Sequence, residues 1–211
     1  MDYMNIEDII EKFKGRVPRP IGINREYSVL IPLINNNGQW EIIYELRSKN
    51  LNQQPGEISF PGGGIEKGET FKEAAIRETI EELNIRKESI EIIGELDYLV
   101  SHENRIIHCF LGIISAVSVD KIEPNESEVD HIFTVPLEFF LETEPDTYYL
   151  DLATVLNDEF PYNLIPKGRG YDWRNGKHSV HFYNYNDYII WGYTAKMTKQ
   201  LIDIIKSPMN S

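Results

Sequence analysis

Residues 62–84 read GGGIEKGETFKEAAIRETIEELN, in which a glycine-rich segment leads directly into a helical pattern. Thr70 and Glu73 match a capping box, in which each side chain accepts a hydrogen bond from the backbone amide of the other residue. This pattern predicts a helix from Thr70 to Leu83. The glycines before the helix permit a close backbone approach that side chains would block. We therefore expect a central loop and helix around which the rest of the fold is arranged.

The predicted helix carries three carboxylates on one face. Glu78, Glu81 and Glu82 stand at positions i, i+3 and i+4, which are neighbours on a helix surface. Like charges at i and i+4 destabilise a helix by roughly 0.2–0.5 kcal/mol per pair, whereas a bound divalent cation would reverse that sign. The alternative is an ordinary solvated acidic face, opposite an apolar side formed by Ile76, Ile80 and Leu83.

Strand-forming segments precede and follow this helix, and the first two are joined by a hairpin signal, Asn35-Asn36-Asn37-Gly38. The aromatic-rich residues 142–187 give no clear pattern, and we expect mainly loop there. Strands on both sides of one central helix indicate an α/β sandwich with a mixed sheet, and the short connections favour a single domain over residues 1–211. The predicted strands span residues 28–34, 39–46, 90–99 and 105–117, and the further helices span residues 6–14, 136–141 and 194–206.

The composition excludes several classes of function. The chain has 211 residues and a formal net charge of −13, which argues against partners gripped through a basic surface, namely nucleic acids and anionic membranes. Cys109 is the only cysteine, so neither an intramolecular disulfide nor a cysteine zinc site is expected. Residues 1–14 lack a signal-peptide pattern, and no apolar run approaches the ~20 residues of a membrane helix. We therefore expect a cytoplasmic protein with a small-molecule partner.

The spacing of the acidic residues is more specific than the composition. From Gly63 onward the chain follows the pattern GX5EX7REX2EE, which resembles the Nudix box. The resemblance implies a Nudix-type α/β/α sandwich, with a central catalytic loop and helix, that hydrolyses nucleoside diphosphate derivatives with Mg²⁺ or Mn²⁺. Two positions depart from the family pattern: Thr79 replaces an aliphatic residue, and Asn84 replaces the usual final glycine. Asn also accepts the left-handed conformation at a helix end.

A second resemblance narrows the substrate. Residues 47–63, RSKNLNQQPGEISFPGG, are similar to the signature of the coenzyme A diphosphatase branch, although Asn52 and Gln54 stand where a basic residue and a histidine are common. Residues 128–137 and the Trp-Gly-Tyr-Thr-Ala segment 191–195 also resemble that branch. The likeness runs from about residue 28 to residue 201, interrupted by an unusual insert at about 144–185. It implies hydrolysis of coenzyme A or its derivatives to 3′,5′-ADP and 4′-phosphopantetheine.

Other functions stay open at this stage. A Nudix hydrolase of ADP-ribose, NADH or a dinucleoside polyphosphate is the nearest alternative. A catalytically silent, ligand-sensing domain is the alternative from a different class, although the complete set of carboxylates argues against it. The oligomeric state is also open, with a homodimer as one alternative.

The resemblance assigns roles to the acidic residues. Glu78 and Glu82 are expected to bind the metal ion, and Glu81 is either a third ligand or the catalytic residue that orients the attacking water. Arg77 is expected to fix the conformations of these carboxylates within the catalytic group. Glu128 is the candidate general base, and an exposed loop glutamate without a role is the alternative reading.

Four further residues are expected to bind substrate. Arg47 has a guanidinium suited to phosphate, although an exposed arginine at a strand end is an equal alternative. Phe60 lies either in the core, which its apolar character favours, or on the floor of the nucleotide pocket. Gly62 and Gly63 would let the backbone approach the pyrophosphate. His178 and the nearby His181 are a weak candidate for a second metal site.

Overall fold

The computed structural model describes residues 5–208 and has a mixed β-sheet at its centre. Strands β1 (Arg25–Asn36) and β2 (Gln39–Arg47) form the predicted hairpin. Asn37 and Gly38 turn the chain with φ values of 52° and 93°, because a two-residue hairpin turn of this hand needs positive φ at both positions. The hairpin signal in the sequence is thereby confirmed.

The sheet combines parallel and antiparallel pairs. Strand β1 runs parallel to β7 (Arg105–Ile114) and antiparallel to β2, while β5 (Ile90–Glu95) and β8 (Val129–Pro136) extend the sheet on its two sides. The expected strand at 90–99 therefore ends earlier, at Glu95, and a separate short strand follows. The remaining short strands are β3 (Ile58–Ser59), which pairs with β2, β4 (Gly62–Gly64), which pairs with β1, and β6 (Leu99–Val100), which pairs with β7.

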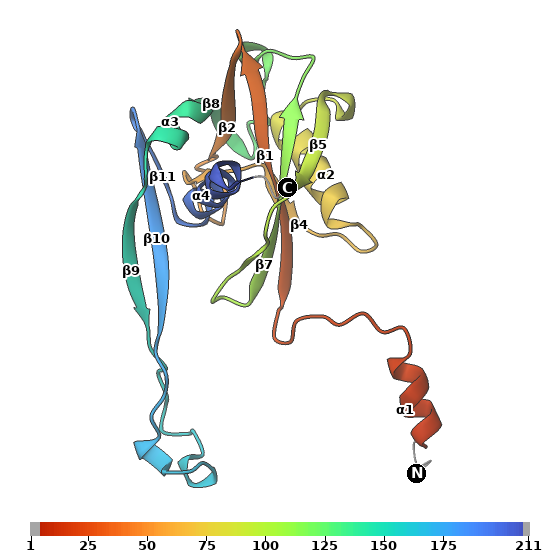
Figure 1. The fold of residues 1–211 in the computed structure, drawn as a ribbon, viewed down its shortest axis with the longest axis vertical. Helices are drawn as coiled ribbons and strands as arrows, with labels where there is room; N and C mark the ends of the chain where they lie inside the picture. The colour runs from red at the N-terminus through yellow and green to blue at the C-terminus, as the bar shows by residue number, and fades with distance from the viewer. Residues whose placement is uncertain (1–4, 209–211) are drawn as a thin grey trace.

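Two helices cover opposite faces of this sheet, as Figure 1 shows. Helix α2 (Phe71–Leu83) packs on one face through a core that includes Leu30 and Ile43, and α4 (Gly192–Lys206) packs on the other through a core that includes Ile31 and Tyr44. Adjacent strand residues belong to different cores because side chains alternate between the faces of a strand. The expected α/β/α sandwich is confirmed.

The ends of α2 follow the sequence signals. Thr70 is the N-cap and forms the complete capping box with Glu73. Asn84 ends the helix with φ 51° and ψ 42°, the left-handed conformation that the usual glycine would adopt. Thr79 is fully buried, and its hydroxyl donates to the Ala75 carbonyl oxygen at 2.7 Å. Both departures from the family pattern are therefore accommodated locally.

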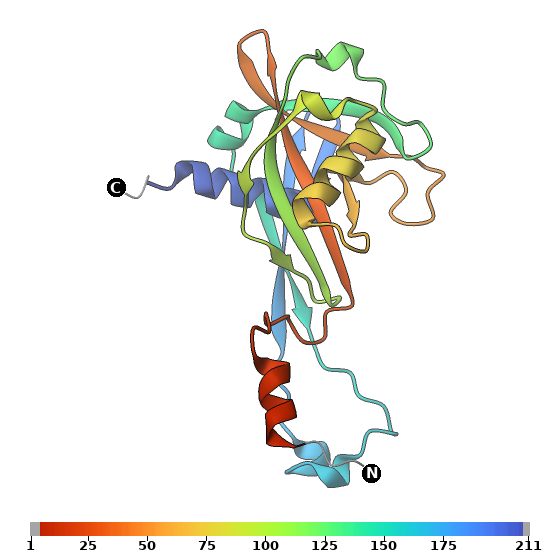
Figure 2. The same ribbon diagram turned by 90° about the vertical axis from the view of Figure 1, so that its right-hand side faces the viewer.

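The expectation of loop is wrong for residues 146–152 and 176–185, which form strands, whereas residues 153–175 between them are loop and 3₁₀ turns. Strands β9 (Asp146–Leu152), β10 (Gly176–Tyr185) and β11 (Tyr188–Trp191) form a second, antiparallel sheet. Its aromatic side chains pack against α4, which lies between the two sheets in Figure 1. Strands β9 and β10 also run outward as a long arm, which Figure 1 shows most clearly and Figure 2 shows from the side. Two 3₁₀ turns, η3 (Tyr162–Leu164) and η4 (Gly168–Gly170), lie at its tip.

The remaining elements are short. Helix α3 (Leu137–Glu142) follows β8, and the 3₁₀ turns η1 (Lys87–Ser89) and η2 (Val119–Lys121) connect strands. Helix α1 (Ile6–Phe13) has no buried residue and lies away from the sandwich in Figures 1 and 2. Within residues 5–208, none of the helices is both long and apolar enough to cross a membrane.

Candidate active site

The glycine loop lies directly against the acidic helix. The Gly62 amide donates a hydrogen bond of 2.8 Å to Glu82 Oε2. Gly62 is opposite Val29 in the pairing of β4 with β1, and a Cβ at this position would collide with the Ser28 carbonyl oxygen and with Val29. Only glycine lets the β4 backbone come close enough to β1 and still hold the Glu82 carboxylate.

Gly63 has a different and more direct relation to the site. A Cβ on Gly63 would collide with the carboxylate of Glu78, whereas a Cβ on Gly64 would meet open space. The backbone of Gly63 therefore forms a wall against which the Glu78 carboxylate rests. The run of three glycines thus contains two positions that require glycine for contact and one that does not.

Arg77 joins the loop to the helix. Its Nε and Nη2 donate to both oxygens of Glu69, at 2.9 and 3.1 Å, and Nη2 also donates to the Gly64 carbonyl oxygen at 3.1 Å. Its Nη1 lies 2.8 Å from Glu78 Oε1 and 3.4 Å from Glu81 Oε2. A planar guanidinium can make all of these contacts at once, and a lysine cannot. Glu69 thereby closes the glycine loop.

The carboxylates do not form a solvated face. Glu82 is only 3% exposed and Glu78 is half-buried, while Glu81 remains exposed. Burial raises the pKa of Glu82 to about 8, against the lowering effect of the Gly62 hydrogen bond. Burial also raises the pKa of Glu78, opposed chiefly by Arg77. The expected solvated alternative is wrong for Glu82, and the supposed apolar side is incomplete because Ile76 and Ile80 are only half-buried.

Glu128 is brought to this cluster by the loop before β8. It immediately precedes β8, and its carbonyl oxygen accepts from the Ser48 amide at 2.8 Å. The same loop is tied to α2, since the Asn125 amide donates to the Glu82 carbonyl oxygen at 2.9 Å. Glu128 is half-buried rather than exposed, and its charge contributes to the raised pKa of both Glu78 and Glu82.

Glu45 is a further candidate site residue that none of the sequence motifs identified. This residue lies in the middle of β2 with no exposed surface, and its pKa is raised well above the usual range by burial and by Glu82. A charged residue within the apolar run Ile42-Ile43-Tyr44-Glu45-Leu46 was the available signal, because unpaired carboxylates are rarely placed inside a sheet.

The donor set suits a hard divalent cation. Several carboxylates lie close enough to raise one another's pKa values, and both Glu45 oxygens are buried with no hydrogen-bond partner in the described part of the chain. Oxygen ligands of this kind are those that Mg²⁺ and Mn²⁺ prefer. Within residues 5–208, no group of three or more His, Cys, Asp or Glu side chains is already arranged to hold a metal ion. In this structure, Arg77 donates a hydrogen bond to one of the Glu78 oxygens and fixes its position.

A pocket of about 200 Å³ opens beside these carboxylates. Arg47 lies at its edge with Nη1 3.9 Å from Glu82 Oε1, and it is not the freely exposed strand-end arginine of the alternative reading. Phe60 is 3% exposed and stacks on Tyr44 at 4.9 Å, so it belongs to the core while its edge lines the pocket. The polar lining is completed by Gln53, Gln54, Glu57, Ser59, Arg105 and Tyr193.

The second sheet extends this pocket. An adjoining cavity of about 250 Å³ shares Gln54, Glu57 and Tyr193 with it and is lined on the far side by Leu150, His178 and Trp191, among others. His178 stands in β10 beside His102, with ring centroids 4.9 Å apart. His181 instead bonds to Thr147. The two histidines therefore do not converge on a metal site.

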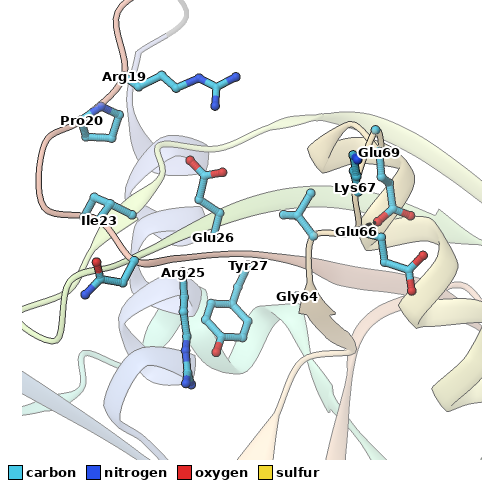
Figure 3. A pocket seen from close by; sticks show the side chains of 13 residues that line it. Arg19, Pro20, Ile23, Arg25, Glu26, Tyr27, Gly64, Glu66, Lys67 and Glu69 are labelled. Atoms are coloured by element: carbon cyan, nitrogen blue, oxygen red, sulfur yellow. Dashed lines mark hydrogen bonds between the residues drawn. The ribbon is translucent and has the colours of Figure 1, made fainter.

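A larger cavity, of about 740 Å³, lies between residues 19–24, which precede β1, and the outer side of the glycine loop. Its cations do not converge, because Arg25 points away from Arg19 and Glu26 projects between them, as Figure 3 shows. Lys67 is accompanied there by Glu66 and Glu69. The smaller pocket beside Glu78 and Glu82 is therefore the better candidate for the active site.

The fold and the site define an α/β/α protein in which a glycine loop lines a polar pocket and contacts the carboxylates of an acidic helix. A family model described as NUDIX domain matches residues 24–153, which is more than half of the chain. The chain therefore belongs to the Nudix family and is a Nudix hydrolase.

Individual relatives are similar over most of the chain. The uncharacterized Nudix hydrolase NudL of Pectobacterium atrosepticum is 28% identical over 200 residues, covering 93% of this chain and 92% of that protein. Peroxisomal coenzyme A diphosphatase NUDT7 of Mus musculus is 28% identical over 181 residues, covering 82% and 67%. The crystal structure of a MutT/nudix family protein from Enterococcus faecalis has a TM-score of 0.52 at 12% identity, covering 98% of this chain and 71% of that one. This last likeness concerns the fold alone.

Proposed function

We propose that this Nudix hydrolase cleaves the pyrophosphate bond of coenzyme A or of its thioesters. The observation that carries the proposal is the position of residues 47–63, whose sequence resembles the coenzyme A diphosphatase signature. Arg47, Gln54 and Phe60 of this segment line the same pocket as Gly62 and Gly63. The similarity to the mouse coenzyme A diphosphatase supports the same substrate.

The reaction is the attack of water on one phosphorus of the anhydride. The new P–O bond forms as the bridging P–O bond breaks, and the bridging oxygen leaves with the other phosphate. Such a reaction needs an aligned nucleophile and neutralisation of charge on the phosphate oxygens. A bound Mg²⁺ or Mn²⁺ would supply most of this neutralisation. Glu78 and Glu82 would hold it, with Glu81 as a third ligand or as the residue that orients the water.

Arg77 and Glu128 act on this group from two sides. Arg77 fixes Glu78 through its 2.8 Å contact and ties it to the glycine loop through Glu69. Glu128 is the candidate base that would accept the proton of the attacking water, since it is held near Glu78 and Glu82 by its loop. Arg47 would bind a substrate phosphate at the mouth of the pocket.

The two adjoining cavities fit a long substrate with a central diphosphate. The smaller pocket beside the carboxylates would take the diphosphate, and the cavity lined by Leu150, His178 and Trp191 would take one of the two ends. ADP-ribose, NADH and dinucleoside polyphosphates share this general form and are the competing substrates.

A substrate panel tests the proposal. The purified chain is incubated with Mg²⁺ or Mn²⁺ and, in parallel, with coenzyme A, an acyl-coenzyme A, NADH, ADP-ribose and diadenosine tetraphosphate. We expect coenzyme A or its thioester to have the highest kcat/KM and to release 3′,5′-ADP. Cleavage of ADP-ribose with coenzyme A left intact would overturn the substrate assignment.

A Glu82→Gln variant separates an enzyme from a ligand-sensing domain. We expect it to lose hydrolysis while the fold, followed by circular dichroism, is retained. Hydrolysis at the wild-type rate in this variant would contradict the metal-ligand assignment. The homodimer and the cytoplasmic location stay predictions, which light scattering and localisation of the tagged chain would test.

A further inference from the structure

Glu45 is a buried carboxylate for which the fold gives no structural partner. Its side chain is 0% exposed, and among residues 5–208 neither carboxylate oxygen has a hydrogen-bond partner. Buried polar groups are nearly always hydrogen-bonded, and buried charges are paired or bind a metal ion. A carboxylate in the middle of β2 therefore requires an explanation.

The neighbours of Glu45 are unsatisfied as well. Side chains alternate along a strand, so Glu45 and Arg47 both face the α2 side of the sheet. Ser59 of β3 lies directly opposite Glu45 in the antiparallel register. The Ser59 hydroxyl and Arg47 Nε are also buried without partners, and only one other such atom, Glu41 Oε2, occurs within residues 5–208. The unsatisfied polar atoms thus gather at one place.

This place adjoins the acidic end of α2. Arg47 Nη1 is 3.9 Å from Glu82 Oε1, a loose contact, and within residues 5–208 no salt bridge joins Arg47 to Glu45. Glu82, Glu128 and Glu78 are each close enough to raise the pKa of Glu45, and Arg47 is the cation that opposes them. Four carboxyl groups thus share this place with one guanidinium.

We propose that Glu45 supplies a further carboxylate ligand to the divalent-cation site, so that the site takes ligands from strand β2 as well as from helix α2. A bound cation would satisfy the Glu45 oxygens and remove the repulsion between Glu45 and Glu82. This inference rests on the metal dependence in the proposed function, and it does not depend on which nucleotide is the substrate.

The test is Mn²⁺ binding to the metal-stripped full chain, measured by isothermal titration calorimetry without any nucleotide. Glu45→Gln keeps the shape of the side chain and removes its charge. Glu41→Gln is the matched control, because Glu41 is on the same strand and face, is 8% exposed and has one unpartnered oxygen. It stands four residues away, about 13 Å along the strand.

We expect Glu45→Gln to weaken Mn²⁺ binding by at least about tenfold, and Glu41→Gln to leave the affinity unchanged. Glu45→Asp keeps the charge on a shorter side chain, so its affinity should fall between those of the wild type and Glu45→Gln. A second readout is the Tm. In chelator, Glu45→Gln should melt at a higher temperature than the wild type because an unpaired buried carboxylate is gone, and its Tm should rise less when Mn²⁺ is added.

Wild-type Mn²⁺ affinity in Glu45→Gln would overturn the proposal and would leave Glu45 as a neutral structural acid. Equal weakening in Glu41→Gln would also overturn it, because the effect would then belong to the strand and not to the site. Failure of the substrate assignment gives a different result: coenzyme A stays intact while the three variants still differ in Mn²⁺ affinity as expected.

Discussion

Gly63 and Gly64 are neighbours that differ in their tolerance for a side chain. A Cβ on Gly63 would displace the Glu78 carboxylate, whereas a Cβ on Gly64 meets nothing within 4 Å. We expect Gly63→Ala to lower kcat about 100-fold, since a displacement of about 1 Å in a catalytic group has an effect of that size. Steady-state kinetics with the preferred substrate measure the change.

Gly64→Ala is the control for this prediction, and it should retain activity because its added methyl group lies in open space. Both variants should have the Tm of the wild type, which separates loss of site geometry from loss of fold. Equal activity in Gly63→Ala and Gly64→Ala would show that Glu78 is free to move and does not need the position seen here.

Arg77 tests whether geometry or charge holds the site together. Arg77→Lys keeps the positive charge but cannot contact Glu69, Glu78 and the Gly64 carbonyl oxygen together, as the arginine does. We expect a 10- to 100-fold weaker metal affinity, roughly the effect of removing a group that orients metal ligands. Mn²⁺ titration of both chains measures it, and an unchanged affinity would reduce Arg77 to a source of charge.

At the scale of the element, the packing of α2 against the sheet buries the Glu82 carboxylate. Because this burial raises its pKa, the free energy of unfolding depends on pH. The pKa of Glu82 is about 8 in the folded chain, above the ordinary value of 4.5. A raised acid pKa contributes stability at low pH, and the contribution is lost as pH rises from about 4.5 to about 8. In chelator, the wild-type Tm should therefore fall over this window more steeply than that of Glu82→Gln.

The difference between these two chains reports Glu82 together with the carboxylates coupled to it, and it removes the contribution of distant titrating groups. His178 and His181 have lowered pKa values, so their effect has the opposite sign, but it is common to both chains and cancels. Adding Mn²⁺ should reduce the wild-type slope, because a bound cation stabilises the ionised carboxylates. Parallel Tm curves for the two chains in chelator would contradict the raised pKa of Glu82.

The sequence predicted those structural features that depend on interactions between residues close together in the chain. The capping box at Thr70 and Glu73, the turn at Asn37 and Gly38, and the left-handed end at Asn84 depend on residues near one another in the chain, and each has the expected form. Glu45 could not be placed in the same way. Its importance comes from the register of β2 with β3 and from the distant helix α2.

The second sheet was missed for a related reason. Strand β9 is exposed along nearly its whole length and therefore lacks the alternation that identifies a half-buried strand. It is held by pairing with β10, about thirty residues later in the chain. Only the part of β10 that packs near α4 carries buried aromatic residues, such as Tyr183. A pattern read along one strand does not reveal a partner at this distance.

At the scale of the whole molecule, the formal net charge is −13, and the acidic residues behind it are unevenly distributed. Glu45 and Glu82 are buried beside the candidate site, where a cation would compensate them, while Glu7, Glu11 and most other acids lie on the surface. The overall charge repels an anionic substrate. In the proposed function, Arg47 and the divalent cation would provide the local attraction for the diphosphate.

The arm divides into a part beside the site and a tip that packs on itself. At the tip, Arg169 lies over the Tyr162 ring at 4.3 Å, and Phe160 meets Trp173 edge to face at 5.7 Å. At the base, Leu150 and His178 line the cavity that adjoins the active site. Replacing residues 154–174 with a short glycine-containing turn should therefore leave both Tm and kcat near their wild-type values.

His178→Ala provides the contrast at the base of the arm. It removes one wall of the adjoining cavity without touching the carboxylates, so we expect KM for the preferred substrate to rise several-fold while kcat changes little, since lost binding remote from the reacting bond acts on the ground state and the transition state alike. Steady-state kinetics give KM and kcat for His178→Ala and for the replacement of residues 154–174. A raised KM in the tip replacement together with an unchanged KM in His178→Ala would move the substrate contact from the base of the arm to its tip.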